Sequence, residues 1–135
     1  MLTTKLIHPQ IMAELAKCGH GSKILIADSN YPLAEKTGNA VKVYLGLTRG
    51  TPTVTEVLDA LLSVINVEKA EVMVPGDGTE PEIFDEFREK LNLPLDGMGR
   101  YEFYDACMKP DTIALAISTG EQRTFANLLI TVGVA

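Results

Sequence analysis

Hydrophobic positions along the chain follow two spacings, one typical of helices and one typical of buried strands. Apolar residues recur every three or four positions after Pro9, after the capping box Thr53-x-x-Glu56 and after Pro81, and a further helix is expected over 100–108. Short, nearly continuous apolar runs predict strands over 24–27, 112–118 and 127–132, an alternating pattern predicts one over 41–47, and a further strand is expected over 71–75. Helices and strands therefore alternate over most of the chain.

The predicted strands are mostly apolar throughout, which is typical of strands covered on both faces. We therefore expect an α/β fold, a three-layer sandwich with a mixed, mostly parallel sheet and helices on both faces. No repeat, low-complexity tract or long linker divides the chain, so residues 1–135 are interpreted as a single domain. Leu93-Pro94 and Gly97-Met98-Gly99 are interpreted as breaks between elements.

Composition and charge exclude several classes of partner. The chain is 46% apolar and 22% charged, and its net charge of −6 disfavours non-specific binding to nucleic acid. No apolar run approaches the ~20 residues needed to cross a bilayer, and no signal-peptide pattern opens the sequence. We expect a cytoplasmic protein that binds neither nucleic acid nor membrane.

Motifs for cofactors, metals and strong nucleophiles do not occur in the sequence. There is no phosphate-binding P-loop, no Gly-x-Gly-x-x-Gly that opens a helix, and no Gly-x-Ser-x-Gly elbow. Cys18 and Cys107 form neither a disulfide framework nor a zinc motif, and both are interpreted as small core residues. Cys18 lies two positions from His20, but it falls in the apolar register of its helix, which disfavours a nucleophilic role. The sequence predicts no cofactor and no metal.

A histidine between two glycines is the strongest candidate for chemistry. His20 follows the first predicted helix, between Gly19 and Gly21, and imidazole is the side chain whose ordinary proton equilibrium lies nearest neutral pH. Asp28 ends the strand that follows. Eight extended residues span roughly 26 Å, so either His20 folds back toward Asp28 or the two residues serve different pockets.

Polar residues at the ends of other elements extend this candidate set, and each also has a structural interpretation. Arg100, Glu121 and Asn127 flank predicted helices and strands, where ligand contacts are commonly carried. They could equally be solvated loop or helix-start residues, while His20 could cap a helix end and Asp28 could form an Asx turn. His8, directly before Pro9, is interpreted as part of a helix entry turn.

Several motifs, in order and over nearly the whole chain, resemble those of one family. They are Gly19-His20-Gly21, Ala-Asp-Ser-Asn-Tyr-Pro at 27–32, Gly-Leu-Thr-Arg-Gly-Thr-Pro at 46–52, Arg100 with Phe103-Tyr104, and Thr119-Gly120-Glu121 leading to Ala126-Asn127. Together they resemble the ribose pyranase and fucose mutarotase family. The resemblance implies an isomerase that interconverts anomers or ring forms of a free monosaccharide without cofactor or metal.

The resemblance also assigns roles to individual residues. His20 matches the proton donor, Asp28 and Arg100 match sugar-binding residues, and 125–127 (Phe125, Ala126 and Asn127) matches the segment that completes the sugar site. In the family that site lies at a subunit boundary of a ring-like homo-oligomer, an octamer or decamer. His20 and Asp28 then need not face a pocket built by one chain. Tyr31 and Phe125 offer rings for stacking on the sugar, and Glu121 is a further candidate.

The choice of sugar is divided between two branches of the family. Arg100 and the Thr-Gly-Glu run resemble the fucose branch, whereas 47–52 resembles the ribose branch. Phe125 stands where the family commonly has a tyrosine, so a hydroxyl is missing there. We favour a fucose-type mutarotase, with a ribose pyranase and a non-catalytic sugar-binding or transport-associated protein as alternatives.

Overall fold

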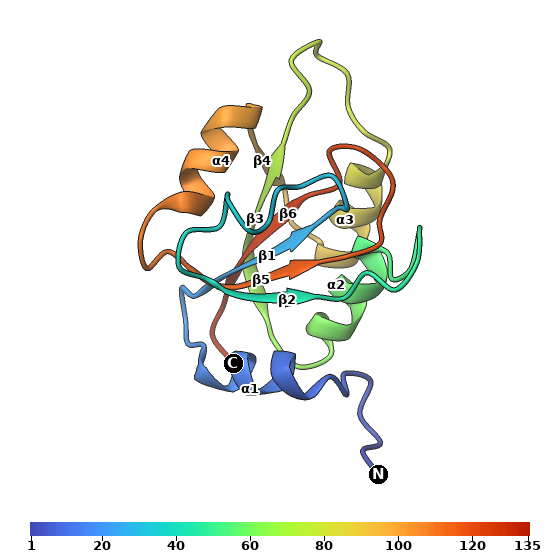
Figure 1. Cartoon of the computed structure of the whole chain (residues 1–135), viewed down its shortest axis with the longest axis vertical. Coiled ribbons are helices and arrows are strands. Elements are labelled where there is room, and N and C mark those ends of the chain that lie inside the picture. The colour runs from blue at the N-terminus through green and yellow to red at the C-terminus, as the bar shows by residue number, and fades with distance from the viewer.

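Five strands of the sheet run in one direction, and the last strand of the chain runs against them. In this computed structural model, which describes residues 1–135, the strand order is β2-β5-β1-β6-β3-β4 (Figure 1). The central strand β1 pairs in parallel with β5 and antiparallel with β6, and β6 in turn pairs antiparallel with β3. The strands are β1 (Lys23–Ala27), β2 (Val41–Tyr44), β3 (Val67–Met73), β4 (Leu95–Met98), β5 (Ile113–Ser118) and β6 (Leu128–Val132). The predicted mixed, mostly parallel sheet is confirmed.

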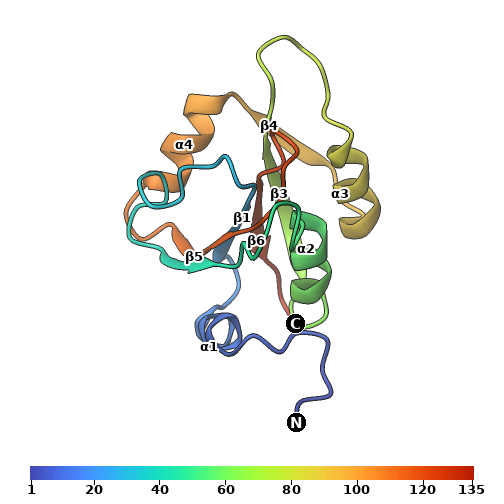
Figure 2. The same cartoon turned by 45° about the vertical axis from the view of Figure 1, so that its right-hand side comes forward.

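Helices cover both faces of this sheet. Helices α2 (Val54–Leu62) and α3 (Ile83–Leu91) lie on one face and α4 (Arg100–Met108) lies on the other, as Figure 2 shows. The first helix, α1 (Pro9–Lys17), lies at the end of the molecule that carries both termini. The predicted three-layer sandwich is confirmed. None of the helices has the length and apolar character that a membrane span requires.

Strand β1 shows why its apolar run is continuous. Successive side chains of a strand point to opposite faces. Ile24 and Ile26 pack in the larger hydrophobic cluster with α1, α2 and α3, whereas Leu25 and Ala27 pack in a second cluster with α4. All four residues have no exposed surface. The continuous run therefore reflects burial on both faces, as the sequence indicated.

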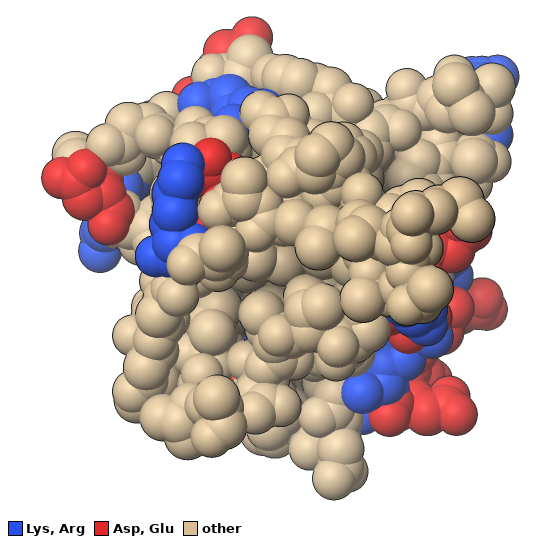
Figure 3. Space-filling model, turned by 90° about the horizontal axis from the view of Figure 1, so that it is seen from below, with Lys and Arg blue, Asp and Glu red and all other residues tan.

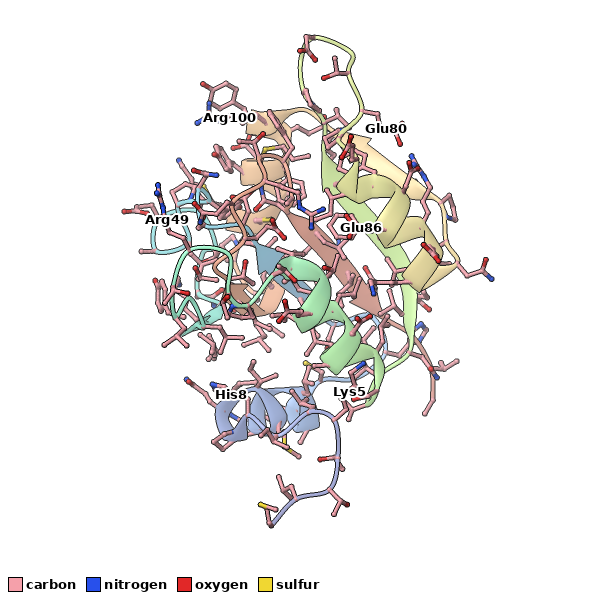
Figure 4. All side chains as sticks on the ribbon, turned by 90° about the vertical axis from the view of Figure 1, so that its right-hand side faces the viewer. Lys5, His8, Arg49, Glu80, Glu86 and Arg100 are labelled. Atoms are coloured by element: carbon pink, nitrogen blue, oxygen red, sulfur yellow. The ribbon has the colours of Figure 1, made fainter.

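Two helix starts follow the capping patterns of the sequence. The Thr53 hydroxyl accepts a hydrogen bond from the N–H of Glu56 (3.1 Å) and caps α2. At α1, Nδ1 of His8 accepts from the N–H of Ile11 (3.2 Å), and Pro9 is the first helical residue. Figure 4 labels His8 at this helix start. The interpretation of His8 as an entry-turn residue is confirmed.

The prediction of a break around 97–99 was wrong. Residues 95–98 form β4, a short edge strand that pairs in parallel with β3. In the sequence, Gly97 is typical of a loop. In the structure it lies within the strand, where a Cβ would be only 2.8 Å from a methyl carbon of Val74, so glycine fits this position. The strand expected over 41–47 ends at Tyr44, and Cys18 is half-buried rather than part of the core.

Candidate active site

A small pocket lies at the edge of the sheet where the five parallel strands end and β6 begins. In open α/β sheets, ligands commonly bind beyond the carboxyl ends of the strands. The cavity has a volume of about 210 Å³. It is lined by Asp28, Asn30, Tyr31, Met73, Arg100, Tyr104, Thr124, Phe125 and Asn127. Of the residues that the sequence singled out, Asp28, Tyr31, Arg100, Phe125 and Asn127 thus come together.

Asp28 is the buried acidic group of the pocket. Its side chain accepts hydrogen bonds from the N–H groups of Asn30 (2.9 Å, to Oδ1) and Ala126 (3.1 Å, to Oδ2), and the residue is 1% exposed. Burial raises the pKa of Asp28, and these hydrogen bonds oppose that effect without cancelling it. The bond to Asn30 is the Asx turn that the sequence offered as a structural alternative. The same carboxyl group nevertheless lines the pocket.

Asn127 lies beside Asp28 and contributes a free donor. Its Oδ1 accepts from the backbone N–H of Asp28 (2.9 Å), which fixes the orientation of the amide. Its amide nitrogen makes no hydrogen bond within the chain, although the residue lines the pocket and is 3% exposed. The pair therefore presents an acceptor and a donor side by side, an arrangement suited to hydroxyl groups.

Arg100 supplies a positive charge at the rim of the pocket. It is the first residue of α4, its Nε donates to the Tyr104 hydroxyl (3.2 Å), and this hydrogen bond raises the pKa of Arg100. The guanidinium lies 5.7 and 5.6 Å from the ring centroids of Tyr101 and Tyr104, and it forms no ion pair with a carboxylate. Figure 4 shows Arg100 at the end of the molecule away from α1. Its remaining N–H groups are therefore available to a ligand.

The rings of Tyr31, Tyr104 and Phe125, together with Met73, form the apolar part of the pocket. The hydroxyl of Tyr31 donates to the carbonyl of Lys36 (2.8 Å), and its ring packs edge-on against Tyr104 with centroids 5.3 Å apart. The half-buried Phe125 has a φ of 58°, in the left-handed region that bulky residues rarely adopt. Such strain persists only where the surrounding structure enforces it. The position of the Phe125 ring is therefore imposed by its loop.

Glu121 and Ala126 support this loop and do not line the pocket. Burial raises the pKa of Glu121, but hydrogen bonds from Arg123 outweigh it, so the net shift is downward. Arg123 also pairs with Glu86 on α3, a residue labelled in Figure 4. The fully buried Ala126 contributes only the backbone N–H that binds Asp28. These contacts fix the 121–127 segment against the neighbouring helix and strand.

His20 lies at the opposite edge of the sheet. It precedes β1 whereas Asp28 follows it, and a five-residue strand spans about 16 Å. The imidazole is 58% exposed, and its Nε2 lies 2.8 Å from Oε2 of Glu68. A second cavity, of about 610 Å³, adjoins it between α1, the end of α2 and the end of β6. Within one chain, therefore, His20 does not fold back toward Asp28.

Sequence reasoning assigned no site role to several residues at these two places, although Tyr104 and Asn30 belong to the quoted motifs. Tyr104 follows Arg100 by four positions on α4, a spacing that places two side chains on one helix face and could have indicated their contact. Asn30, Met73 and Thr124 also line the pocket, while Glu68 approaches His20 from 48 positions away with no local signal. No group of three or more His, Cys, Asp or Glu side chains is placed to hold a metal ion.

The fold and the pocket define a small α/β protein with a polar, partly aromatic site at the carboxyl edge of its sheet. Residues 1–135 match the sequence profile of the RbsD / FucU transport protein family, and the chain belongs to that family. A D-ribose pyranase of Chloroflexus aggregans is 27% identical over 135 residues, which cover 99% of this chain and 98% of that protein.

Solved structures of the same fold include two sugar complexes. Bacillus subtilis RbsD complexed with D-ribose superposes with a TM-score of 0.86 at 23% identity, covering 100% of this chain and 99% of that one. The fucose mutarotase of Streptococcus pneumoniae in complex with L-fucose has a TM-score of 0.80 at 23% identity, with the same coverage. The resemblance that the motifs indicated is confirmed at the level of family and fold.

Proposed function

We propose that this protein is an isomerase that opens and recloses the ring of a free monosaccharide, as a mutarotase or pyranase. The observation that carries the proposal is the small pocket, in which a buried carboxyl, an amide, a guanidinium and aromatic rings converge. Membership of the family supports it, since curated and solved relatives are named D-ribose pyranase and fucose mutarotase.

The proposed reaction needs only proton transfers. Opening a cyclic hemiacetal adds a proton to the ring oxygen and removes one from the anomeric hydroxyl, while the bond between the anomeric carbon and the ring oxygen breaks. Attack of the same hydroxyl on the other carbonyl face gives the other anomer, and attack of a different hydroxyl changes the ring size. A positioned acid/base group typically accelerates such a step ~10²–10⁴-fold.

The lining residues provide groups that suit a sugar. Asp28 accepts hydrogen bonds from sugar hydroxyls, and Asn127 and Arg100 donate them, through the amide nitrogen and the guanidinium fork. Tyr31 and Phe125 offer ring faces and edges to the apolar C–H side of the sugar. These groups hold the sugar, and none of them is assigned the proton transfer.

His20 is proposed as the proton donor, contributed by a neighbouring subunit. Because His20 and the pocket lie at opposite edges of one chain, this role requires a homo-oligomer with sites at subunit boundaries, such as the ring-like octamer or decamer that the resemblance implies. The end that carries α1 and the termini supports such contacts, because its centre is largely uncharged in Figure 3. Exposed apolar residues of the terminal segments and of the loop after α2 support it too: Leu2, Ile7, Val64 and Val134.

Two observations favour different sugars. Arg100, which lines the pocket and with the Thr-Gly-Glu run resembles the fucose branch of the family, supports our preference for a fucose-type mutarotase. Similarity to curated D-ribose pyranases favours the ribose pyranase. A non-catalytic sugar-binding role also stays open, since the family description names transport.

Exchange spectroscopy on sugars at anomeric equilibrium tests the proposal. Fucose, ribose and galactose are compared with wild-type protein, His20→Ala and the control His8→Asn, which keeps a capping side chain on α1. We expect faster exchange between anomers or ring forms with wild type and His8→Asn, and its loss in His20→Ala. Saturable binding of a sugar without faster exchange would overturn catalysis in favour of the binding role.

A further inference from the structure

Glu68 brings a carboxylate from β3 into contact with the imidazole of His20. Its Oε2 lies 2.8 Å from Nε2, and the side chains of His20 and Glu68 are 58% and 45% exposed. Exposed pairs of this kind add little to the stability of a fold. Since the contact contributes little to stability, we look for its role in the function of His20.

The backbone around His20 is held in place, but two properties of the imidazole are left unfixed. Gly21, with a φ of 89°, donates to the carbonyl of Val132 on β6 (2.8 Å), and Ser22 accepts from the N–H of Val132 (2.8 Å). The Ser22 hydroxyl also accepts from the N–H of Gly19 (3.0 Å). These bonds fix the loop to the sheet on both sides of His20. What they do not fix is the rotation of the imidazole and the nitrogen that carries its proton.

Glu68 supplies both of these constraints. An ionised carboxylate only accepts hydrogen bonds, so Nε2 must carry the hydrogen when the pair is formed. A partner on one ring nitrogen sets the role of the other. Nδ1 is then directed away from Glu68, and neither ring nitrogen has another partner within the chain. Apart from His20 itself, the side chains that line the cavity beside it carry no charge, so Glu68 is the one carboxylate side chain in contact with the imidazole.

We propose that Glu68 is a positioning residue for His20: it holds Nε2 as a protonated nitrogen in both charge states of the ring, so that Nδ1 gives its proton to the ring oxygen of the sugar from the imidazolium and takes one back from the anomeric hydroxyl. This inference rests on the proposed function, because it assigns the atom of His20 that works in ring opening. Glu68 itself touches no sugar. Its effect is on the orientation and tautomer of the imidazole.

Kinetics of Glu68 variants provide the first test. In Glu68→Ala, kcat for anomer or ring-form exchange should fall about 10-fold, the scale of one lost hydrogen bond, while KM stays nearly unchanged. Glu68→Gln keeps an acceptor oxygen and should retain intermediate activity. Glu89→Ala, which removes an exposed glutamate without a partner from α3, is the control and should match wild type. An unchanged kcat in Glu68→Ala, or an increase in KM alone, would overturn the proposal.

The tautomer of His20 gives a second readout that does not require activity. Long-range ¹H–¹⁵N spectra of the neutral imidazole should show the Nε2–H form in wild type and a mixture of both tautomers in Glu68→Ala. His8 serves as an internal reference, because its Nδ1 accepts from Ile11 in both proteins. Identical His20 spectra in the two proteins would refute the positioning role. A wild-type protein that accelerates no sugar would instead refute the proposed function, whatever the spectra show.

Discussion

The carboxyl group of Asp28 accepts a hydrogen bond from the backbone N–H of Ala126, 98 positions further along the chain (3.1 Å). This contact ties the end of β1 to the loop before β6, next to the strained Phe125. The residue proposed to hold the sugar therefore also shapes the wall of the pocket. Loss of its acceptor oxygens should affect binding and stability together.

Asp28→Asn tests this double role. An amide presents one oxygen and one NH₂ to two backbone donors, so one buried N–H loses its partner, at a cost of about 1–3 kcal/mol. We expect the free energy of unfolding in urea to fall by that amount and sugar affinity to fall with it. Asp105→Asn, an exposed substitution on α4, is the matched control. Unchanged stability would show that the Ala126 contact does not hold the loop.

The free energy of unfolding should depend on pH because the buried Asp28 has a raised pKa in the folded state. Burial raises its pKa in the folded state above the ordinary 3.8. The stability associated with the protonated form is therefore fully present below 3.8 and is lost as pH rises through the folded pKa. The stability difference between wild type and Asp28→Asn, measured by urea unfolding, should thus shift against wild type as pH rises through this window. A difference independent of pH would contradict the raised pKa.

Glu121 contributes a pH dependence of stability with the opposite sign to that of Asp28. A titration of stability must therefore distinguish the two carboxyl groups. Its pKa is lowered in the folded state below the ordinary 4.5, the net result of burial and of the stronger opposing bonds from Arg123. Its stabilisation is present above 4.5 and is lost as pH falls through the folded pKa. Asp28→Asn leaves the Glu121 side chain in place, so the difference between wild type and variant reports Asp28 together with its repulsion by Glu121, one of the causes that raise the pKa of Asp28.

Arg100→Lys tests the guanidinium at the pocket rim. Lysine keeps the charge but loses the planar fork and its stacking on Tyr101 and Tyr104. Because Arg100 is exposed, we expect unchanged stability and a rise in KM for the preferred sugar of about 10-fold, the scale of one lost hydrogen bond. Comparing fucose with ribose shows which sugar uses the fork. Equal KM values for variant and wild type on both sugars would remove Arg100 from the binding site.

Sequence patterns predicted the elements that are long or buried and missed those that depend on neighbours. The continuous run in β1 indicated burial on both faces. Asp28 and Asn127 lie at one edge because β6 runs antiparallel to β1, which no pattern in the sequence predicted. Strand β4 could not be recognised, because Gly97 is a loop signal unless the Val74 side chain that approaches it is known. Glu68 meets His20 only through the pairing of β3 with β6, which no local pattern encodes.

Phe125 provides the sharpest test of the loop geometry, because two substitutions remove the same ring and differ only in backbone preference. Its φ of 58° suits glycine, whereas residues with a Cβ pay about 1–2 kcal/mol in the left-handed region. Phe125→Gly should therefore be more stable than Phe125→Ala by about 1 kcal/mol in urea unfolding, although glycine is ordinarily the costlier residue to order. Both variants should lose sugar affinity equally, since both lack the ring. If the alanine variant were the more stable, Phe125 would not occupy the left-handed conformation, and the pocket wall would carry no backbone strain at this position.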